Sequence, residues 1–343
     1  MTKATTAVPG PVMRLRELAH SAACAASVRA AALLGLADAL GEEAATAADL
    51  ATAIGADEEA LIRLLRSLTT YGVFAEDADG AYVHTSESRL LREDAENSIK
   101  YNVLWATEPW TWELWQHLDE AVRTGKGVFP SLHGEEFFSY LHSSAPRSAE
   151  VFDRAMTQSS QLSARAIAEQ LDLTEVSSVA DIAGGQGLVL ATLLERNPRL
   201  HGTLLDLPDV VARPDARLAE GGAFAARTRL LPGDCLKEIP VQADVYIFKN
   251  ILEWDDRSTV TALRNAVAAA RPGARVLVIE NLVDGSPELK FTTAMDLLLL
   301  LNVGGKKHTR DGLAALMEEA GLRVGDIRPV NSYLHLFDAT VPA

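Results

Sequence analysis

The sequence predicts an α/β fold, in which a doubly wound, mostly parallel sheet follows an N-terminal, mostly helical domain of winged-helix-like layout. Three observations lead to this prediction. Apolar residues recur at helical spacing as far as about Leu171, and short apolar, partly β-branched runs alternate with helical stretches after Thr174. The last two such runs lie so close together that they must pair antiparallel. We expect domains at residues 13–105, 106–172 and 173–343.

The first domain is expected to hold helices, a turn and a two-stranded wing. Helices are predicted at residues 18–40, 46–54 and 57–71, and strands at 73–76 and 81–85. Asp79-Gly80 is a good hairpin turn between the two strands. Residues 1–100 carry nine basic and fifteen acidic side chains. This charge disfavours DNA binding, so we expect the domain to serve dimerisation and to frame a pocket.

The segment from residue 99 to 171 is predicted to be helical and is unusually aromatic. It holds Trp105, Trp110, Trp112, Trp115, Phe129, Phe137, Phe138 and Tyr140, and thus four of the five tryptophans. Part of this set is ordinary core, and the rest is expected to line a pocket for an aromatic substrate at the domain junction. We expect Trp105, Trp112 and Phe129 to contact that substrate.

The third domain alternates strands and helices. Strands are predicted at residues 177–183, 203–207, 228–232, 243–249 and 275–280, with helices at 188–197 and 259–270 among the connections. The runs 324–330 and 333–339 flank Asn331-Ser332 and are too close for a parallel crossover. A parallel sheet closed by such a hairpin distinguishes methyltransferase sheets from most dinucleotide-binding ones.

A glycine-rich loop follows the first of these strands. The strand ends at Asp181 and leads into Gly184, Gly185 and Gly187. A backbone without Cβ atoms turns tightly and allows a ligand to approach. The glycines lack the first-third-sixth spacing of nicotinamide sites, and no Gly-Lys-Ser/Thr follows. The acidic-x-x-Gly-Gly-x-Gly form is the one in which the amino-acid end of a methionine lies over the loop.

Two further acids end the next two strands. Asp206 is placed to accept hydrogen bonds from a ribose diol, and Asp234 to meet an adenine amino group. Because the acids end successive parallel strands, they line one crevice at the carboxyl edge of the sheet. With Asp181 and the glycine loop, this set predicts a site for S-adenosylmethionine.

With these motifs, the chain resembles the caffeic-acid-type and hydroxyneurosporene-type O-methyltransferases, especially those that tailor antibiotics in actinobacteria. The resemblance extends over nearly the full length of the chain. The matching segments are residues 179–187, 203–211, 232–234, 249–256 and 304–309. The resemblance implies a Rossmann-like seven-stranded methyltransferase sheet and a homodimer with interlocking N-terminal helices. It also implies cofactor contacts from Gly184, Asp206, Asp234, Cys235 and Lys249, with Trp254 near the adenine and Met156 and Ser160 near the methionine end. We expect Asn250 and Asn302 to contact the substrate.

The chain departs from the family at the catalytic positions. Family members usually carry Lys-Asn-x-Leu-His-Asp-Trp after the fourth strand, and its histidine is the general base. Here the segment that begins at Lys249 reads Lys-Asn-Ile-Leu-Glu-Trp-Asp-Asp, with Glu253 nearest to the missing histidine. One helper glutamate survives as Glu280, whereas the second has become Lys307, with His308 beside it. The candidate catalytic groups are therefore Glu253, His308 and Glu280.

We expect a methyltransferase that acts on a small, aromatic secondary-metabolite intermediate of antibiotic biosynthesis. The sulfonium is already activated, and proximity supplies about 7–11 kcal/mol in favourable cases, whereas a general base contributes a factor of about 10²–10⁴. Methyl transfer to oxygen with help from these groups, or to nitrogen or carbon by positioning, is therefore expected. The alternatives are a relative that binds the cofactor but decarboxylates, hydroxylates or steers a cyclisation, and a winged-helix, ligand-sensing regulator.

The composition excludes several partners. The formal charge of −15 disfavours nucleic acid and anionic membranes. No apolar run approaches the ~20 residues of a spanning helix, and residues 1–12 lack signal-peptide order and are expected to be a lead-in. Two cysteines, Cys24 and Cys235, suit a reducing cytoplasm. An iron(II) site could in principle use Glu253, either Asp255 or Asp256, and His308 as ligands. No two of these ligands have the close spacing typical of a metal site, so we expect no metal.

Overall fold

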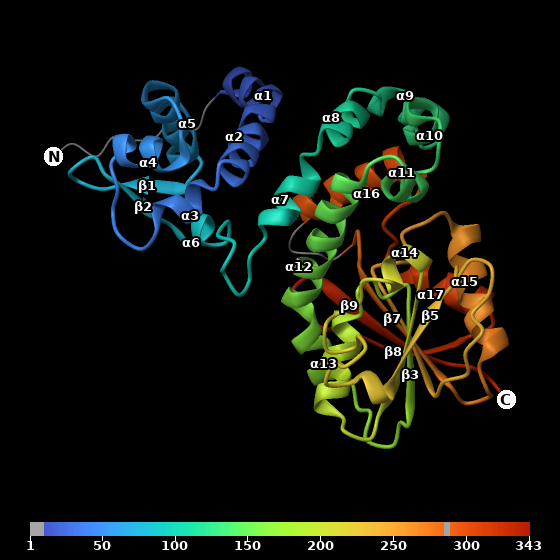
Figure 1. Cartoon of the computed structure of the whole chain (residues 1–343). Helices are drawn as coiled ribbons and strands as arrows, with labels where there is room; N and C mark the ends of the chain where they lie inside the picture. The colour runs from blue at the N-terminus through green and yellow to red at the C-terminus, as the bar shows by residue number, and fades with distance from the viewer. Residues whose placement is uncertain (1–9, 285–288) are drawn as a thin grey trace. The chain divides into compact units, whose positions relative to one another are not determined.

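The computed structural model describes residues 10–284 and 289–343. Residues 1–9 of the expected lead-in lie outside the described residues. The chain divides into two compact units, Met1–Glu108 and Pro109–Ala343 (Figure 1). The finer division at residues 105/106 and 172/173 remains a prediction.

The first unit is mostly helical and carries a two-stranded wing. Its elements are α1 (Pro11–Ala19), α2 (Ala22–Leu33), α3 (Leu36–Leu40), α4 (Ala47–Ile54), α5 (Glu58–Thr70), β1 (Phe74–Glu76), β2 (Tyr82–His84), α6 (Ser86–Arg89) and α7 (Lys100–Ala106). The single helix predicted over residues 18–40 is wrong, because the chain breaks after Ala19 and again at Gly35. Gly35 has a φ of 65°, which ends one helix and starts the next at low cost.

The other predicted elements of this unit are confirmed, and their ends have local causes. The side chains of Thr46 and Asp57 accept hydrogen bonds from Asp49 N and Ala60 N, so each caps the N-terminus of its helix. The wing strands pair antiparallel, with Ala75 opposite Val83. Leucines of α3, α4 and α5 pack with Phe74 into the core of the unit.

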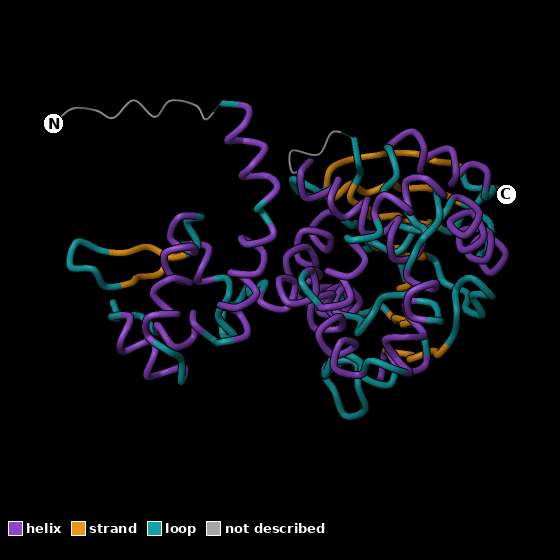
Figure 2. Tube along the Cα trace, turned by 90° about the horizontal axis from the view of Figure 1, so that it is seen from above, coloured by secondary structure: helices purple, strands orange, loops and turns teal. Residues whose placement is uncertain are grey.

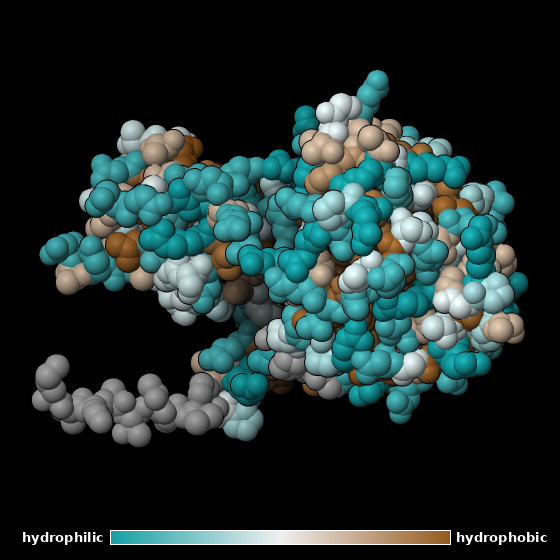
Figure 3. Space-filling view, turned by 90° about the horizontal axis from the view of Figure 1, so that it is seen from below, coloured by the Kyte–Doolittle hydropathy of each residue, from teal (hydrophilic) through white to brown (hydrophobic). Residues whose placement is uncertain are grey.

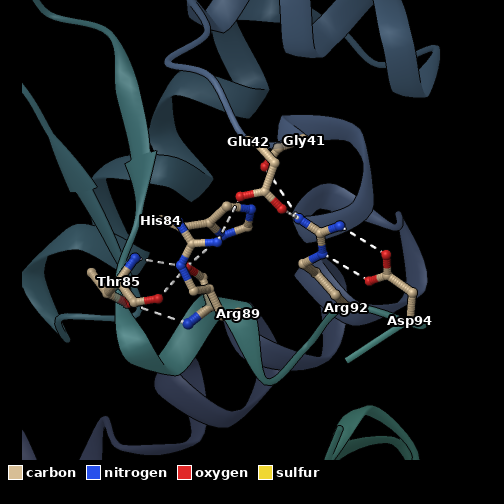
Figure 4. Close-up of polar contacts among 8 residues, drawn as sticks. Gly41, Glu42, His84, Thr85, Arg89, Arg92 and Asp94 are labelled. Atoms are coloured by element: carbon tan, nitrogen blue, oxygen red, sulfur yellow. Dashed lines mark hydrogen bonds and ion pairs between the residues drawn. The ribbon is translucent and has the colours of Figure 1, made fainter. Parts of the chain in front are cut away.

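A small network of ion pairs joins the turn after α3 to the segment after the wing (Figure 4). Glu42 accepts from Arg89 and Arg92, and Arg92 also forms two bonds to Asp94. Most of these side chains are exposed, so each pair contributes at most about 1 kcal/mol. The network therefore fixes the path of the chain more than it stabilises the unit.

Five helices open the second unit: α8 (Pro109–Trp115), α9 (Leu118–Thr124), α10 (Phe129–His133), α11 (Phe137–Ser143) and α12 (Pro146–Gln170). Trp110, Phe129 and Phe137 are buried, and their rings contact each other at centroid distances of 5.1–6.0 Å. Part of the aromatic segment is therefore core, as expected.

A seven-stranded sheet forms the centre of this unit. Its strands are β3 (Ser178–Ile182), β4 (His201–Asp206), β5 (Thr228–Pro232), β6 (Val245–Lys249), β7 (Arg275–Asn281), β8 (Arg323–Pro329) and β9 (Leu334–Thr340). They lie in the order β5-β4-β3-β6-β7-β9-β8. The first five strands are parallel, and β9 is antiparallel to both of its neighbours. The predicted sheet and its closing hairpin are confirmed.

Helices cover both faces of the sheet (Figure 2). Alternate residues such as Val179 and Ile247 face α12 and α13 (Leu188–Arg196). Ala180 and Phe248, the residues that follow them, pack on the other side with α15 (Asp256–Ala269) and α17 (Arg310–Glu319). This alternation follows from the two-residue period of a strand. The remaining elements are α14 (Pro208–Val211), a 3-10 turn at Ala225–Arg227 and α16 (Leu289–Val303).

One face of the molecule is drawn in space-filling form in Figure 3. The face drawn in Figure 3 is mostly hydrophilic, with apolar residues scattered over it. Within residues 10–284 and 289–343, no helix is long and apolar enough to cross a membrane.

Candidate functional site

Four neighbouring parallel strands bring the predicted cofactor residues to one edge of the sheet. Asp181 lies near the end of β3, Asp206 ends β4 and Lys249 ends β6. Asp234 follows β5 by two residues. Since β5, β4, β3 and β6 are adjacent and run in the same direction, these side chains share the carboxyl edge, where open α/β sheets bind ligands.

The glycine loop passes directly over Asp181. A Cβ atom built on Gly184 would lie 2.4 Å from Cγ of Asp181, so only glycine fits there. Ala183 and Gly185 have φ angles of 51° and 62°, which turn the chain sharply as it leaves β3. The loop therefore presents bare backbone along the edge of the sheet.

Asp181 is buried beneath this loop. Its Oδ2 atom has no hydrogen-bond partner among the described residues. Burial, together with the charge of Asp206, raises the pKa of Asp181 to about 7, although Lys249 opposes the shift. Asp181 thus lies under the loop, and its contact with the cofactor remains a prediction.

Asp206 is held in one orientation by the backbone. Its Oδ2 accepts from Gly185 N at 2.7 Å, and its Oδ1 accepts from Leu207 N at 2.7 Å. Burial raises the pKa of Asp206 to about 6, while these two N–H groups limit the rise. Each carboxylate oxygen keeps a further lone pair, so the group can still accept from a diol.

Asp234, predicted to meet the adenine, and Cys235 lie just after the end of β5. Asp234 accepts from Leu236 N at 3.0 Å through Oδ1, and its Oδ2 lies 3.4 Å from Nζ of Lys237. Cys235 is buried, and this raises the pKa of its thiol to about 12. Trp254 packs against the same core cluster as Cys235. Cys235 is therefore a neutral, apolar neighbour of Asp234.

Helix α12 is joined to this edge by two hydrogen bonds that the sequence pattern did not predict. Thr157 donates its hydroxyl to Oε1 of Gln186 at 2.8 Å, and Lys249 donates Nζ to Ser160 at 3.3 Å. Burial lowers the pKa of Lys249. Met156 and Ser160 lie on the turns that make these contacts. Gln186 is the one polar side chain among the three loop glycines, and this feature of the sequence could have indicated a partner on another element.

Glu280, at the end of β7, fixes the loop that follows β6. Its Oε1 accepts from Ile251 N at 2.9 Å and from Leu252 N at 3.0 Å. Asn250 enters the loop with a φ of 50°. Burial, reinforced by the charge of Glu253, raises the pKa of Glu280 well above its usual range. Glu280 therefore supports the backbone that presents Glu253.

Glu253 and Lys307 form a direct ion pair, with Lys307 Nζ donating to Glu253 Oε1. The lysine side chain is 6 % exposed and that of the glutamate 18 %. Burial alone would lower the pKa of Lys307, but the charges of Glu253 and Glu280 raise it above its ordinary value. Lys307 is consequently a fixed, buried cation.

His308 uses its ring to hold the same loop. Its Nε2 lies 2.8 Å from Leu252 O, and because a carbonyl only accepts, Nε2 carries the hydrogen. Burial lowers the pKa of His308. The structure thus brings Glu253, Glu280 and His308 to one loop. The base role predicted for His308 remains a prediction.

The predicted substrate residues are spread over both units. Phe129 lies fully buried in α10 and Trp112 half-buried in α8, whereas Trp105 belongs to α7 of the first unit. Asn302, near the end of α16, is 5 % exposed, and its Oδ1 has no partner within the described part of the chain. The same holds for Oδ1 of Asn250. Their contacts with a substrate remain predictions.

The aromatic helices are joined to the loop that carries Lys307. Val128 N donates to Leu301 O at 2.9 Å, and a Cβ atom on Gly127 would lie 2.9 Å from Gly304 N. Figure 1 shows α16 beside α8 to α12. Among the residues that the structure describes, no three His, Cys, Asp or Glu side chains gather as a metal site requires.

The chain matches two protein families along most of its length. Residues 16–94 match the O-methyltransferase dimerisation domain, and residues 115–323 match the O-methyltransferase domain. The mitomycin biosynthesis 6-O-methyltransferase of Streptomyces lavendulae is 38 % identical over 302 residues, which cover 88 % of this chain and 86 % of that protein. The aclacinomycin 10-hydroxylase RdmB of Streptomyces purpurascens is 33 % identical, covering 92 % and 85 %.

Solved structures agree with these relatives. The mitomycin 7-O-methyltransferase MmcR superposes with a TM-score of 0.86 at 35 % identity, covering 96 % of this chain and 97 % of that one. The O-methyltransferase NcsB1 from neocarzinostatin biosynthesis, in complex with S-adenosylmethionine and 2-hydroxy-5-methyl naphthoic acid, superposes with a TM-score of 0.78 at 31 % identity, covering 93 % and 96 %.

Proposed function

The chain belongs to the S-adenosylmethionine-dependent O-methyltransferase family, and from this premise we propose that it methylates a small aromatic intermediate of antibiotic biosynthesis. The methyl donor is S-adenosylmethionine, which supplies an electrophilic methyl group. The observation that carries the proposal is the carboxyl edge of the sheet, where the glycine loop and Asp206 form one rigid site.

The residues at this edge fit the donor. The Cβ-free loop at Gly184 leaves backbone open to the methionine end, with Asp181, Met156, Ser160 and Lys249 nearby. Asp206 keeps acceptor capacity for the ribose hydroxyls. We assign the adenine end to Asp234, Cys235 and Trp254.

The chain's own residues are proposed to position the acceptor rather than to deprotonate it. The histidine that serves as base in the family is absent, and Glu253 stands nearest to its place. That carboxylate is committed to Lys307, and Glu280 holds the loop. His308 is proposed to act structurally, through its bond to Leu252 O. Holding the nucleophile in line with the methyl group can lower the barrier by about 7–11 kcal/mol.

We further propose that the working form is a homodimer. The match of residues 16–94 to a dimerisation domain supports this. Helix α1 also has no buried residue, and it exposes Val12, Met13, Leu15 and Leu18. An amphipathic helix with an exposed apolar face gains stability when that face is covered.

A labelled methyl donor tests the proposed reaction. The protein is incubated with S-adenosyl-[methyl-²H₃]methionine and a panel of hydroxylated and aminated bicyclic aromatic compounds, and the products are measured by mass spectrometry. The proposal predicts a product that carries the deuterated methyl group and an equal amount of S-adenosylhomocysteine.

One relative supports a second candidate function, hydroxylation without methyl transfer, because RdmB is named as an aclacinomycin 10-hydroxylase. With this chain, a hydroxylated or decarboxylated product without the label would contradict methyl transfer and support that candidate.

A further inference from the structure

The charges of Glu253 and Lys307 stand where the family resemblance expects a histidine and a glutamate. In that arrangement the histidine removes the acceptor proton. In this chain the carboxylate and the ammonium pair with each other instead. A carboxylate that neutralises a buried ammonium is a poor base, because protonating it would leave Lys307 uncompensated.

The loop that carries Lys307 is held from several sides. Lys307 N donates to Oδ1 of Asp296 at 2.6 Å, and Lys306 N donates to Glu253 O at 3.1 Å. A Cβ atom on Gly305 would lie 1.9 Å from Glu253 O, so the two loops touch at backbone level. The backbone around Lys307 is therefore held in place, and its ammonium is held by the ion pair to Glu253.

The charged groups that act on Lys307 are Glu253, Glu280, Asp296 and, from the end of β6, Lys249. An ammonium has three donors and no acceptor, and one of the three is directed at Oε1 of Glu253. Lys307 remains protonated, so it cannot take a proton from a hydroxyl. It can bind an oxygen that has already lost its proton.

Two buried side-chain oxygens, each within five residues of Lys307 or Glu253 in the sequence, lack a hydrogen-bond partner among the described residues. Asn302, five residues before Lys307, is nine-tenths buried, and its Oδ1 is without a partner in the described ranges. Oδ1 of Asn250, three residues before Glu253, is buried and likewise without one. Buried polar atoms normally have partners, so these two orphaned acceptors point to a ligand that donates hydrogen bonds through groups other than the reacting oxygen.

We propose that Lys307 binds the acceptor oxygen as an oxyanion, so that the chain selects aromatic substrates whose hydroxyl is already acidic, such as hydroxyquinones and electron-poor phenols. This inference rests on the proposed function. The proton leaves to solvent before the reaction. A lone pair of the oxyanion then forms the O–C bond to the methyl carbon while the electron pair of the S–C bond returns to sulfur. The products are a neutral ether and a neutral thioether, and no protein base takes part.

Two probes of similar size and different acidity test the inference. 2-Hydroxy-1,4-naphthoquinone is acidic and has a coloured anion. 2-Naphthol is much less acidic, with a pKa near that of an ordinary phenol, about 10. With the protein saturated in S-adenosylhomocysteine, an absorbance titration reports the ionisation of the bound quinone. We expect the wild type to bind it as the anion and to lower its apparent pKa.

Lys307→Met should abolish that shift and lower kcat/KM for methylation of the quinone about 10²-fold, as the loss of an oxyanion donor does in other enzymes. Lys306→Met is the matched control. It removes the same charge one residue earlier, from a side chain that is 47 % exposed and paired with Asp256, and it should leave both readouts within about twofold.

Glu253→Gln separates the two roles. If Glu253 were the base, this change would cost a factor of about 10²–10⁴ in turnover. Our inference predicts a loss below about tenfold, with tighter binding of the quinone anion, because Lys307 is no longer neutralised. Should Lys307→Met fail to fold, the double variant Glu253→Gln/Lys307→Met removes both charges and should show the same loss of the absorbance shift.

Binding of S-adenosylhomocysteine is measured first on every variant. Absence of binding to the wild type would refute the proposed function itself. Normal binding and methyl transfer, combined with equal kcat/KM for the quinone and 2-naphthol at neutral pH, would overturn only the inference. Lys307→Met behaving like Lys306→Met would overturn it as well.

Discussion

Gly185 donates its backbone N–H to the carboxylate of Asp206 across 2.7 Å. This bond joins the glycine loop after β3 to the acid that ends β4, so the groups proposed for the methionine and ribose ends form one structural unit. A change in either residue therefore acts on both ends of the donor site.

Replacing Asp206 with alanine should weaken binding of S-adenosylhomocysteine about tenfold or more, because a hydrogen bond to a charged group contributes about 1.5–3 kcal/mol. Thermal unfolding checks this, since a ligand that binds only the folded state raises Tm. The rise seen with the wild type should largely disappear. Asp209→Ala, an exposed acid three residues later, is the control and should keep it. An undiminished rise with Asp206→Ala would refute the ribose assignment.

The affinity for S-adenosylhomocysteine should depend on pH. Burial raises the pKa of Asp206 to about 6. The ionised form, the better acceptor, therefore predominates above this value and is lost as the pH falls through it. Equilibrium dialysis between about pH 7.5 and about pH 5 should show weakening affinity toward acid. Asp206→Asn, which does not titrate, should give a flatter profile. A wild-type profile as flat as that of Asp206→Asn would contradict this role.

A methyl group at position 184 should damage the site. The new Cβ atom would lie 2.4 Å from Cγ of Asp181, whose side chain is buried. We expect Gly184→Ala to lose about 1–3 kcal/mol of unfolding free energy, as overpacked sites do. Urea denaturation measures it. Gly233→Ala is the control, because its Cβ atom would meet nothing closer than 3.8 Å. Equal stability of the two variants would show that the loop after β3 can move away from Asp181 to accommodate the added methyl group.

Substitutions of Glu253 and Lys307 should have non-additive effects on the free energy of unfolding, because the two side chains form an ion pair. Removing one partner leaves a buried charge unpaired, which costs about 3–5 kcal/mol for a fully buried pair and less where one partner keeps some exposure. Lys307→Met should therefore cost more than the double variant Glu253→Gln/Lys307→Met. A double-mutant cycle by chemical denaturation measures the coupling. Strictly additive losses of unfolding free energy would mean that the two side chains do not stabilise each other.

Charging the apolar face of α1 should weaken the proposed dimer. Leu15 and Leu18 are 69 % and 59 % exposed, so glutamate at both positions leaves the core of the unit intact. Sedimentation velocity should show dimers for the wild type and a shift toward monomers for Leu15→Glu/Leu18→Glu. Val122→Glu changes a similarly exposed apolar residue of α9 and should stay dimeric. Persistence of the dimer in the double variant would exclude this face from the interface.

The sequence predicted those parts of the fold that local patterns encode. Short apolar strands and the closing antiparallel hairpin were both visible from spacing and residue type. The break at Gly35 was missed because the apolar periodicity continues through it, and only the positive φ of that glycine reveals the turn.

The candidate site was predictable only in part. The acids at the strand ends follow from the alternation of strands and helices, because parallel strands share a carboxyl edge. The contact between Glu253 and Lys307 joins residues 54 positions apart, and no local pattern indicates it. The bond between Thr157 and Gln186 depends in the same way on how α12 packs on the sheet.

Isothermal titration calorimetry with S-adenosylhomocysteine tests the central claim most directly, because it asks whether the carboxyl edge of this sheet binds the nucleoside at all. We predict that one molecule binds per chain with a Kd in the micromolar range or below. Absence of binding in that range, with a correctly folded protein, would contradict it.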